Sequence, residues 1–183
     1  YRTVHVSKFR GSSAQRGRHT LRIGDSGMSV FPRLQVGTAN DSRQHTELSS
    51  GVAELDEMLS GGVTTGTVTF FSGPTGVGKT TTGLQFIAEA AKRDIRSVLY
   101  SFEEDTETLL ARSEAVNIPV RDLLDDGTLT IREIDSGTQT VDEFTSHLRE
   151  EVEQRGTELV MIDGTTGFER GLVGSDDPRS NPV

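Results

Sequence analysis

Alternating apolar and polar residues near the start of the chain predict short β-strands. Residues 4–9 alternate in this way, as do residues 20–23 and 28–31, and the turn sequence Gly24-Asp25-Ser26-Gly27 separates the last two runs. A period of two places the apolar side chains on one face of a strand, and a glycine-bounded turn of this length joins antiparallel neighbours. The first part of the chain is therefore predicted to be a small antiparallel β unit, with residues 10–19 as a polar loop.

From residue 50 onward the pattern changes to helical spacing interrupted by short apolar runs. Ser50 is the expected N-cap of the first helix, and Gly61-Gly62 ends it. The apolar face of this helix consists of Val52, Leu55, Met58 and Leu59. A later helix over 141–154 has a predicted core face of Val141, Phe144, Leu148 and Val152.

Strands and helices alternate through this second region. The predicted helices cover 52–59, 79–92, 106–116, 122–124 and 141–154. The predicted strands cover 67–71, 97–100, 128–131 and 158–162. The first of these strands is predicted to be buried. Such alternation is typical of an α/β fold in which helices flank a parallel sheet. The polar stretch 38–46 is the expected linker, so we divide the chain into segments 1–37 and 47–183. The tail 164–183 is rich in Gly, Ser, Asp and Pro, and we expect it to be poorly ordered.

Composition narrows the classes of function. The chain has 183 residues and a formal charge of -9, which opposes sequence-independent binding to nucleic acid. It contains no cysteine, so disulfides and thiolate metal sites are excluded. No apolar run approaches the roughly 20 residues needed to span a bilayer. These features favour a cytoplasmic protein, and the missing initiator Met predicts a fragment.

The segment from Gly73 to Thr80 carries the chemistry of a phosphate-binding loop. Its sequence, Gly73-Pro74-Thr75-Gly76-Val77-Gly78-Lys79-Thr80, combines glycines that accept positive φ with backbone amides at a helix N-terminus. Lys79 is expected to bind the β and γ phosphates, and Thr80 a Mg²⁺ ion. The predicted strand before the loop and the helix after it support this interpretation over a glycine turn with a surface lysine. The predicted ligand-binding set is Gly73, Thr75, Gly76, Val77, Gly78, Lys79, Thr80 and Thr81, and the ligand is ATP.

Carboxylates follow two other predicted strands. Asp163 ends the strand 158–162, and together with the phosphate-binding loop it is interpreted as a magnesium ligand; alone, Asp163-Gly164 would be a common turn. Glu103 and Glu104 follow the strand 97–100, where a carboxylate is suitably placed to activate water. The pattern by itself favours a solvated acidic turn that caps the next helix.

These residues together resemble the KaiC group of the RecA-like ATPases. The resemblance extends over about 120 residues and rests on the phosphate-binding loop, Leu48 to Asp56, Gly61-Gly62, Ser101-Phe102-Glu103-Glu104 and Met161-Ile162-Asp163. It implies that Glu103 is the general base, that Glu104 is its catalytic partner, and that Lys79 assists in catalysis. It also implies a nucleotide-binding protein that forms a homo-oligomer, a hexameric ring in the family, when the full-length protein is present.

The N-terminal β unit is similar to the closing strands of a KaiC-type module. The chain thus resembles the end of one module (1–37) joined to the start of the next (47–183). In the family the Lys-x-Arg-Gly-Ser segment reaches the nucleotide of the adjacent protomer, which implies trans contacts from Lys8, Phe9, Arg10 and Ser12. Without the resemblance, these residues are interpreted as an exposed basic hairpin.

The sequence therefore predicts an ATP-binding, Mg²⁺-dependent ATPase of the RecA-like class with a role in signalling or timing. Two alternatives stay open. One is a DNA-stimulated, recombinase-like ATPase, which the negative charge disfavours. The other is a regulatory module that holds ATP as a conformational ligand without hydrolysing it.

Overall fold

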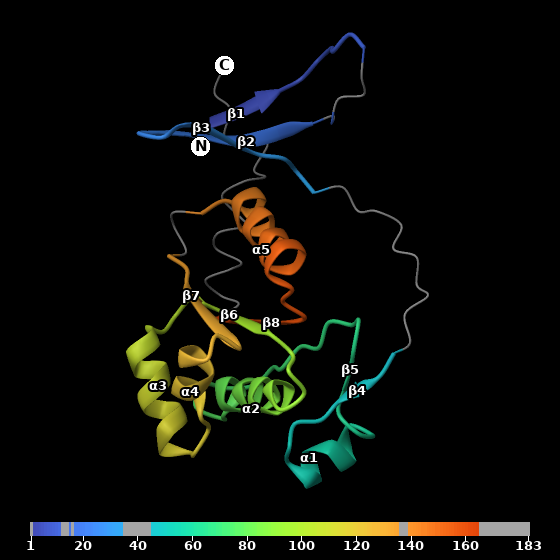
Figure 1. Ribbon diagram of the computed structural model, residues 1–183, viewed down its shortest axis with the longest axis vertical. Coiled ribbons are helices and arrows are strands. Elements are labelled where there is room, and N and C mark those ends of the chain that lie inside the picture. The colour runs from blue at the N-terminus through green and yellow to red at the C-terminus, as the bar shows by residue number, and fades with distance from the viewer. Residues whose placement is uncertain (1, 12–14, 16, 35–44, 136–138, 165–183) are drawn as a thin grey trace. The chain divides into compact units, whose positions relative to one another are not determined.

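The structure, a computed structural model, describes residues 2–11, 15, 17–34, 45–135 and 139–164. Within them the chain forms two compact units (Figure 1). The N-terminal unit contains three strands and the helix α5, and the second unit contains the other described helices and strands. The predicted poorly ordered tail lies outside the described residues except for Gly164. The division of the chain into parts of two modules stays a prediction.

The strands of the N-terminal unit form the antiparallel sheet that the sequence predicts. Its order is β1-β2-β3, with β1 at Arg2–His5, β2 at Arg18–Gly24 and β3 at Gly27–Phe31. Gly24 pairs with Gly27, so Asp25 and Ser26 form a two-residue hairpin loop. The helix α5 (Val141–Arg155) packs against β2 and β3.

A capping box starts α5 and also fastens it to the sheet. The Thr140 amide donates to Glu143 Oε2 at 2.8 Å, and the Glu143 amide donates back to Thr140 Oγ1 at 3.3 Å. Arg22 of β2 donates from its guanidinium to both carboxylate oxygens of Glu143, whose side chain is only 2% exposed. The pair joins β2 to the first turn of α5, and the Arg22 side chain itself is half exposed. Phe144 is buried as predicted, but Val152 is exposed, so that part of the predicted core face is wrong.

The described part of the second unit contains nine elements, and those after residue 78 lie within a few residues of their predicted positions. Two short strands, β4 and β5, were not predicted, and they pair with each other in antiparallel orientation. The elements are β4 (Glu47–Leu48), α1 (Ala53–Met58), β5 (Val63–Thr64), α2 (Lys79–Ala91), β6 (Ser97–Ser101), α3 (Thr106–Ala115), α4 (Val120–Asp125), β7 (Leu129–Glu133) and β8 (Leu159–Asp163).

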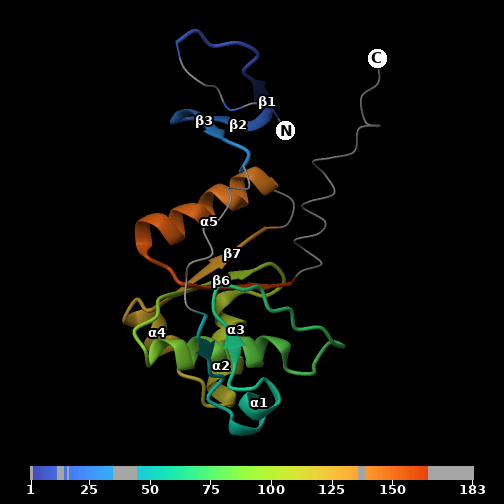
Figure 2. The ribbon, with the colours of Figure 1, turned by 90° about the vertical axis from the view of Figure 1, so that its right-hand side faces the viewer.

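The predicted parallel sheet is confirmed, with strand order β7-β6-β8. Leu99 of β6 aligns with Ile131 on one side and Met161 on the other. The helices α2, α3 and α4 lie on the same side of this sheet (Figure 2). Their apolar residues, including Leu84, Leu109 and Val120, form the main core with Leu99 of β6 and Leu129 of β7. The carboxyl ends of β6 and β8 are thereby fixed beside each other.

The predicted buried strand over 67–71 is wrong. In the structure these residues form no strand, and Val68 is 98% and Phe70 70% exposed. Phe71 alone rests on the helix, with its ring stacked on Phe86 of α2. A strand needs a hydrogen-bonded neighbour as well as apolar composition. Among the described residues β8 pairs only with β6, and residues 67–71 are paired with no strand.

The start of α1 also differs from the prediction. Its N-cap is Val52, which makes no side-chain capping bond, and Met58 of the predicted apolar face is 82% exposed. Ser50 instead donates from both its amide and its hydroxyl to Asp56 Oδ1 at 2.7 Å. Ser49 Oγ donates to Asp56 Oδ2 at 2.5 Å. One carboxylate thus ties the segment before α1 to the helix, in place of a side-chain cap.

These hydrogen bonds predict a pH-dependent contribution to stability. The bond from Ser49, and after it those from Ser50, lower the pKa of Asp56 below its ordinary value of 3.8. A lowered folded-state pKa stabilises the fold above the unfolded value, and this stability is lost as the pH falls through the folded value. We expect Asp56→Asn to lower the thermal midpoint at pH 7 by a few degrees, and the difference from the parent to narrow once the pH falls below the ordinary value of 3.8. Calorimetry at pH 7, 5 and 3 measures this. Glu57→Gln, an exposed change on the same helix, is the control, and a difference that stays constant with pH would contradict the assignment.

Candidate functional site

The phosphate-binding loop joins the exposed segment 67–71 to α2. Gly76 and Gly78 have φ values of +84° and +91°, which side chains rarely adopt. No atom lies within 4 Å of the position where a Cβ would be added at either glycine, so the backbone conformation and not packing requires glycine there. The first amides of the 13-residue helix α2 have no partner within the helix and are available to an anion.

Lys79 is the first residue of α2, and its side chain folds back over the loop. The ammonium group donates to the carbonyl oxygens of Gly73 at 2.9 Å and Pro74 at 2.8 Å. The charge is therefore held inside the curve of the loop, close to the free amides. An anion bound there would meet both the helix N-terminus and a positive charge.

Thr80 and Asp163 meet at the same end of the unit. Thr80 Oγ1, in the first turn of α2, donates to Asp163 Oδ2 at 2.8 Å, and Asp163 is the last residue of β8. Mg²⁺ is commonly held by one carboxylate and a hydroxyl, with phosphate oxygens and water as its other ligands. No group of three or more His, Cys, Asp or Glu side chains suited to a metal occurs among the described residues. The donor set thus fits a magnesium ion that arrives with a nucleotide.

Glu103 packs against Gly164, the residue that follows Asp163. The Phe102 amide donates to the Asp163 carbonyl at 3.0 Å, which aligns the residues that follow β6 and β8. Gly164 has a φ of +90°, and a Cβ added there would lie 2.8 Å from Glu103 Cγ and 3.1 Å from Phe102 Cβ. Glycine at 164 therefore leaves room for the Glu103 side chain next to the predicted magnesium ligand.

Glu104 is oriented differently from its neighbour. Its carboxylate Oε1 accepts from Arg112 Nη2 on α3. The two adjacent glutamates therefore have different surroundings: Glu103 lies against Gly164, and Glu104 against α3. Sequence analysis missed both Arg112 and the packing role of Gly164. Arg112 follows Glu104 by eight positions. This spacing is only a weak sequence signal for an ion pair between the two.

The other predicted site residues are divided between the two units. Thr75 and Val77 lie in the phosphate-binding loop, and Thr81 lies in the first turn of α2. Lys8, Phe9 and Arg10 belong to the N-terminal unit, where they follow β1 and are exposed. Ser12 lies outside the described residues. Contacts of these four N-terminal residues with a neighbouring nucleotide stay a prediction.

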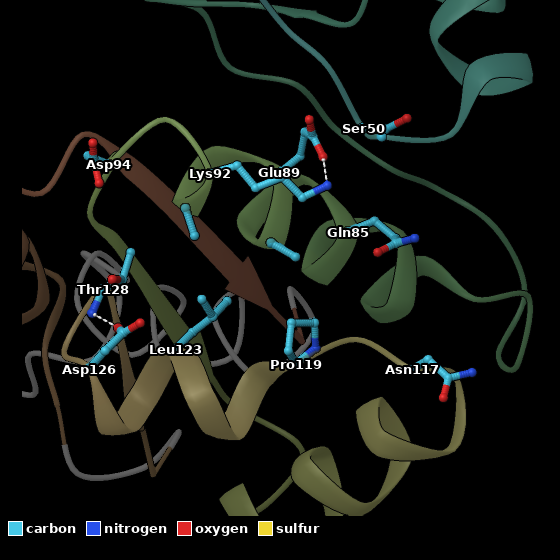
Figure 3. Close-up of a pocket in the computed structure, with 13 residues that line it drawn as sticks. Ser50, Gln85, Glu89, Lys92, Asp94, Asn117, Pro119, Leu123, Asp126 and Thr128 are labelled. Atoms are coloured by element: carbon cyan, nitrogen blue, oxygen red, sulfur yellow. Dashed lines mark hydrogen bonds and ion pairs between the residues drawn. The ribbon is translucent and has the colours of Figure 1, made fainter.

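A separate pocket of about 500 Å³ lies along the second half of α2. Figure 3 shows Glu89 of α2 joined by an ion pair to Lys92, the residue that follows this helix, with Ser50 on the same side; Leu123 of α4 and Asp126 also line the pocket. None of the predicted nucleotide-binding residues lines this pocket. It carries no part of the phosphate site.

Comparison with known proteins identifies the family. The sequence model described as "ATPase: KaiC" matches residues 48–179, which is more than half of the chain. This chain belongs to the KaiC ATPase family. The match includes the phosphate-binding loop, Glu103, Glu104 and Asp163, so the site described above lies inside the family domain. The RecA-like class predicted for the fold is confirmed.

Curated relatives of the family align with most of the chain. The circadian clock oscillator protein KaiC of Acaryochloris marina is 27% identical over 171 residues, 93% of this chain and 33% of the relative. The protein of the same name from Prochlorococcus marinus is 33% identical over 130 residues, 71% of this chain and 26% of the relative. That of Synechococcus elongatus is 26% identical over 171 residues. The chain spans about a third of the length of the relatives it matches, or less.

No helix among the described residues is long and apolar enough to cross a membrane.

The close approach at Gly164 predicts a local packing defect when a side chain is added. Gly164→Ala would strain a positive φ, at a cost of about 1–3 kcal/mol, and would also press against Glu103 and Phe102. Gly127→Ala is a matched control, because Gly127 has a φ of +77° but no atom within 4 Å of the added Cβ. Chemical denaturation should show Gly164→Ala less stable than Gly127→Ala by about 1–3 kcal/mol. Equal losses would mean that Glu103 does not pack against this glycine.

Proposed function

We propose that the chain binds MgATP and hydrolyses it. The observation that carries this proposal is the contact between Thr80 and Asp163 beside the folded-back Lys79. The start of α2 thus brings together the groups that bind a metal-bound polyphosphate. These are a hydroxyl, a carboxylate, a lysine and the free amides of the helix. The family match, an ATPase domain, supports the same activity.

The roles of the residues follow from this arrangement. The amides of Gly76 to Thr81 bind phosphate oxygens, and Lys79 leaves its carbonyl partners to neutralise charge on the β and γ phosphates. Thr80 and Asp163 would hold Mg²⁺, which would supply charge stabilisation to the phosphate oxygens. Glu103 orients a water molecule and takes its proton as the water oxygen bonds to the γ-phosphorus and the bond to the ADP oxygen breaks. Glu104, in the same turn, acts as its partner without contacting the phosphates.

The setting of this activity is part of the proposal. The relatives are named as circadian clock oscillator proteins, which supports a role in timing or signalling. The proposed location is the cytoplasm. In a longer protein that assembles as a homo-oligomer, Lys8, Phe9, Arg10 and Ser12 would reach the nucleotide of a neighbouring protomer. An arginine supplied across an interface stabilises charge on a transferring phosphoryl group, so hydrolysis would be faster in the assembly than in the isolated chain.

Removal of Lys79 tests nucleotide binding. Lys79→Ala should weaken MgATP binding at least about tenfold, because hydrogen bonds to charged groups contribute about 1.5–3 kcal/mol. Isothermal titration calorimetry gives the Kd directly. Lys92→Ala is the matched control: Lys92 follows the same helix but pairs with Glu89 near the separate pocket. Equal affinity of the Lys79 variant and the parent would overturn the proposal.

Replacement of Glu103 tests hydrolysis. Glu103→Gln keeps the shape of the side chain but removes its basicity, so turnover should fall about 10²–10⁴-fold while the Kd for MgATP changes less than twofold. Phosphate release with and without single-stranded DNA measures the rate.

The same assay separates the alternatives. A rate that rises on adding single-stranded DNA would favour the recombinase-like ATPase. If the parent chain binds MgATP but hydrolyses it negligibly, and Glu103→Gln leaves that rate unchanged, the non-hydrolysing regulatory module is favoured.

A further inference from the structure

Arg112 makes an ion pair at the edge of the proposed site. It lies on α3, and its Nη2 donates to Oε1 of Glu104. The Glu104 side chain is 15% exposed and that of Arg112 47% exposed, so the carboxylate is largely covered while the guanidinium retains access to water. A pair of this kind restricts the carboxylate more than a fully exposed surface pair would.

The turn that carries Glu103 and Glu104 is held at both of its ends. Ser101 Oγ donates to the Glu104 carbonyl at 2.5 Å, which closes the turn. The Asp105 carboxylate accepts from the Thr108 amide at 2.8 Å and so caps α3. The Thr106 amide and hydroxyl donate to Glu133 Oε1 from the end of β7. These bonds fix the backbone of the turn, but none of them involves the side-chain carboxylate of Glu103 or Glu104.

The ion pair and the packing at Gly164 set different directions for the two adjacent side chains. Glu104 is drawn toward α3, and Glu103 lies against Gly164, next to Asp163. Two free carboxylates at the end of β6 would repel each other and compete for the same metal and phosphate environment. With Glu104 neutralised by Arg112, Glu103 is the glutamate of this turn left beside Asp163.

We propose that Arg112 is a positioning residue for hydrolysis: by binding Glu104 it holds that carboxylate away from the phosphates and presents Glu103 to the attacking water. This inference rests on the proposed function and assigns the two glutamates unequal roles. Arg112 touches neither substrate nor reacting atoms and acts through Glu104.

The experiment compares three arginine variants in the full chain. Arg112→Ala should lower kcat about tenfold while KM for MgATP stays within twofold, and Arg112→Lys should recover part of that loss because it retains the charge. Arg121→Ala is the matched control: Arg121 pairs with Glu114 of α3 at 2.8 Å, but both side chains are half exposed and remote from the turn. An equal loss in Arg121→Ala would show a general effect on helix stability and overturn the proposal.

A double-mutant cycle tests whether the effect passes through Glu104. In the Glu104→Gln background, adding Arg112→Ala should change kcat less than twofold, because the charge that Arg112 restrains is already gone. A tenfold loss that persists in this background would overturn the assignment. If turnover of the parent is too slow to follow, the affinity of MgADP with aluminium fluoride relative to MgADP alone is measured instead. That ratio should fall about tenfold in Arg112→Ala, and an unchanged ratio would overturn the proposal.

Failure of this inference is distinguishable from failure of the proposed function. If the parent binds MgATP, Lys79→Ala abolishes binding and Glu103→Gln abolishes turnover, but Arg112→Ala has the kcat of the parent, only the role of Arg112 is overturned. If the parent binds no nucleotide, both are overturned.

Discussion

The contact between Thr80 and Asp163 is the constraint on which the second unit depends. The two residues are 83 positions apart, so the hydroxyl and the carboxylate meet only if several elements are placed correctly. β8 must add to β6 in parallel register, so that Asp163 aligns with Ser101, and α2 must pack against β8 with its first turn at the same end. The buried residues of α2, α3 and α4 provide this placement, because their shared core fixes the helices beneath the strands. The functional site is thus a consequence of core packing more than of local sequence.

Local periodicity predicted most of the helices and strands. It succeeded where the element makes its own hydrogen bonds, as in α2, or where a neighbour was also predicted, as in the parallel sheet. It failed at residues 67–71, because apolar composition says nothing about whether a partner strand is present, and Val68 and Phe70 are exposed. It predicted α1 but not its start, because Ser50 donates to the Asp56 carboxylate and is not the N-cap of the helix.

The candidate site was predicted to a similar extent. Loop glycines, Lys79, Thr80 and Asp163 belong to a compact motif or to a strand end, so their positions follow from sequence and topology. The unequal surroundings of Glu103 and Glu104 could not be predicted, because they depend on two contacts outside the motif. One is made by Arg112, and the other is made possible by the missing side chain of Gly164. Neighbouring carboxylates of the same type therefore receive different functions from the elements packed around them.

The exposed segment at 67–71 has a consequence for the behaviour of the chain in solution. Thr67-Val68-Thr69-Phe70-Phe71 is uncharged and rich in residues that favour extended conformations, and it lies free of any sheet among the described residues. Segments of this composition are templates for intermolecular β pairing and aggregation. The net charge of -9 opposes such association at long range. Intermolecular pairing through these five residues beside the phosphate-binding loop is therefore the route by which copies of the chain would associate at high concentration.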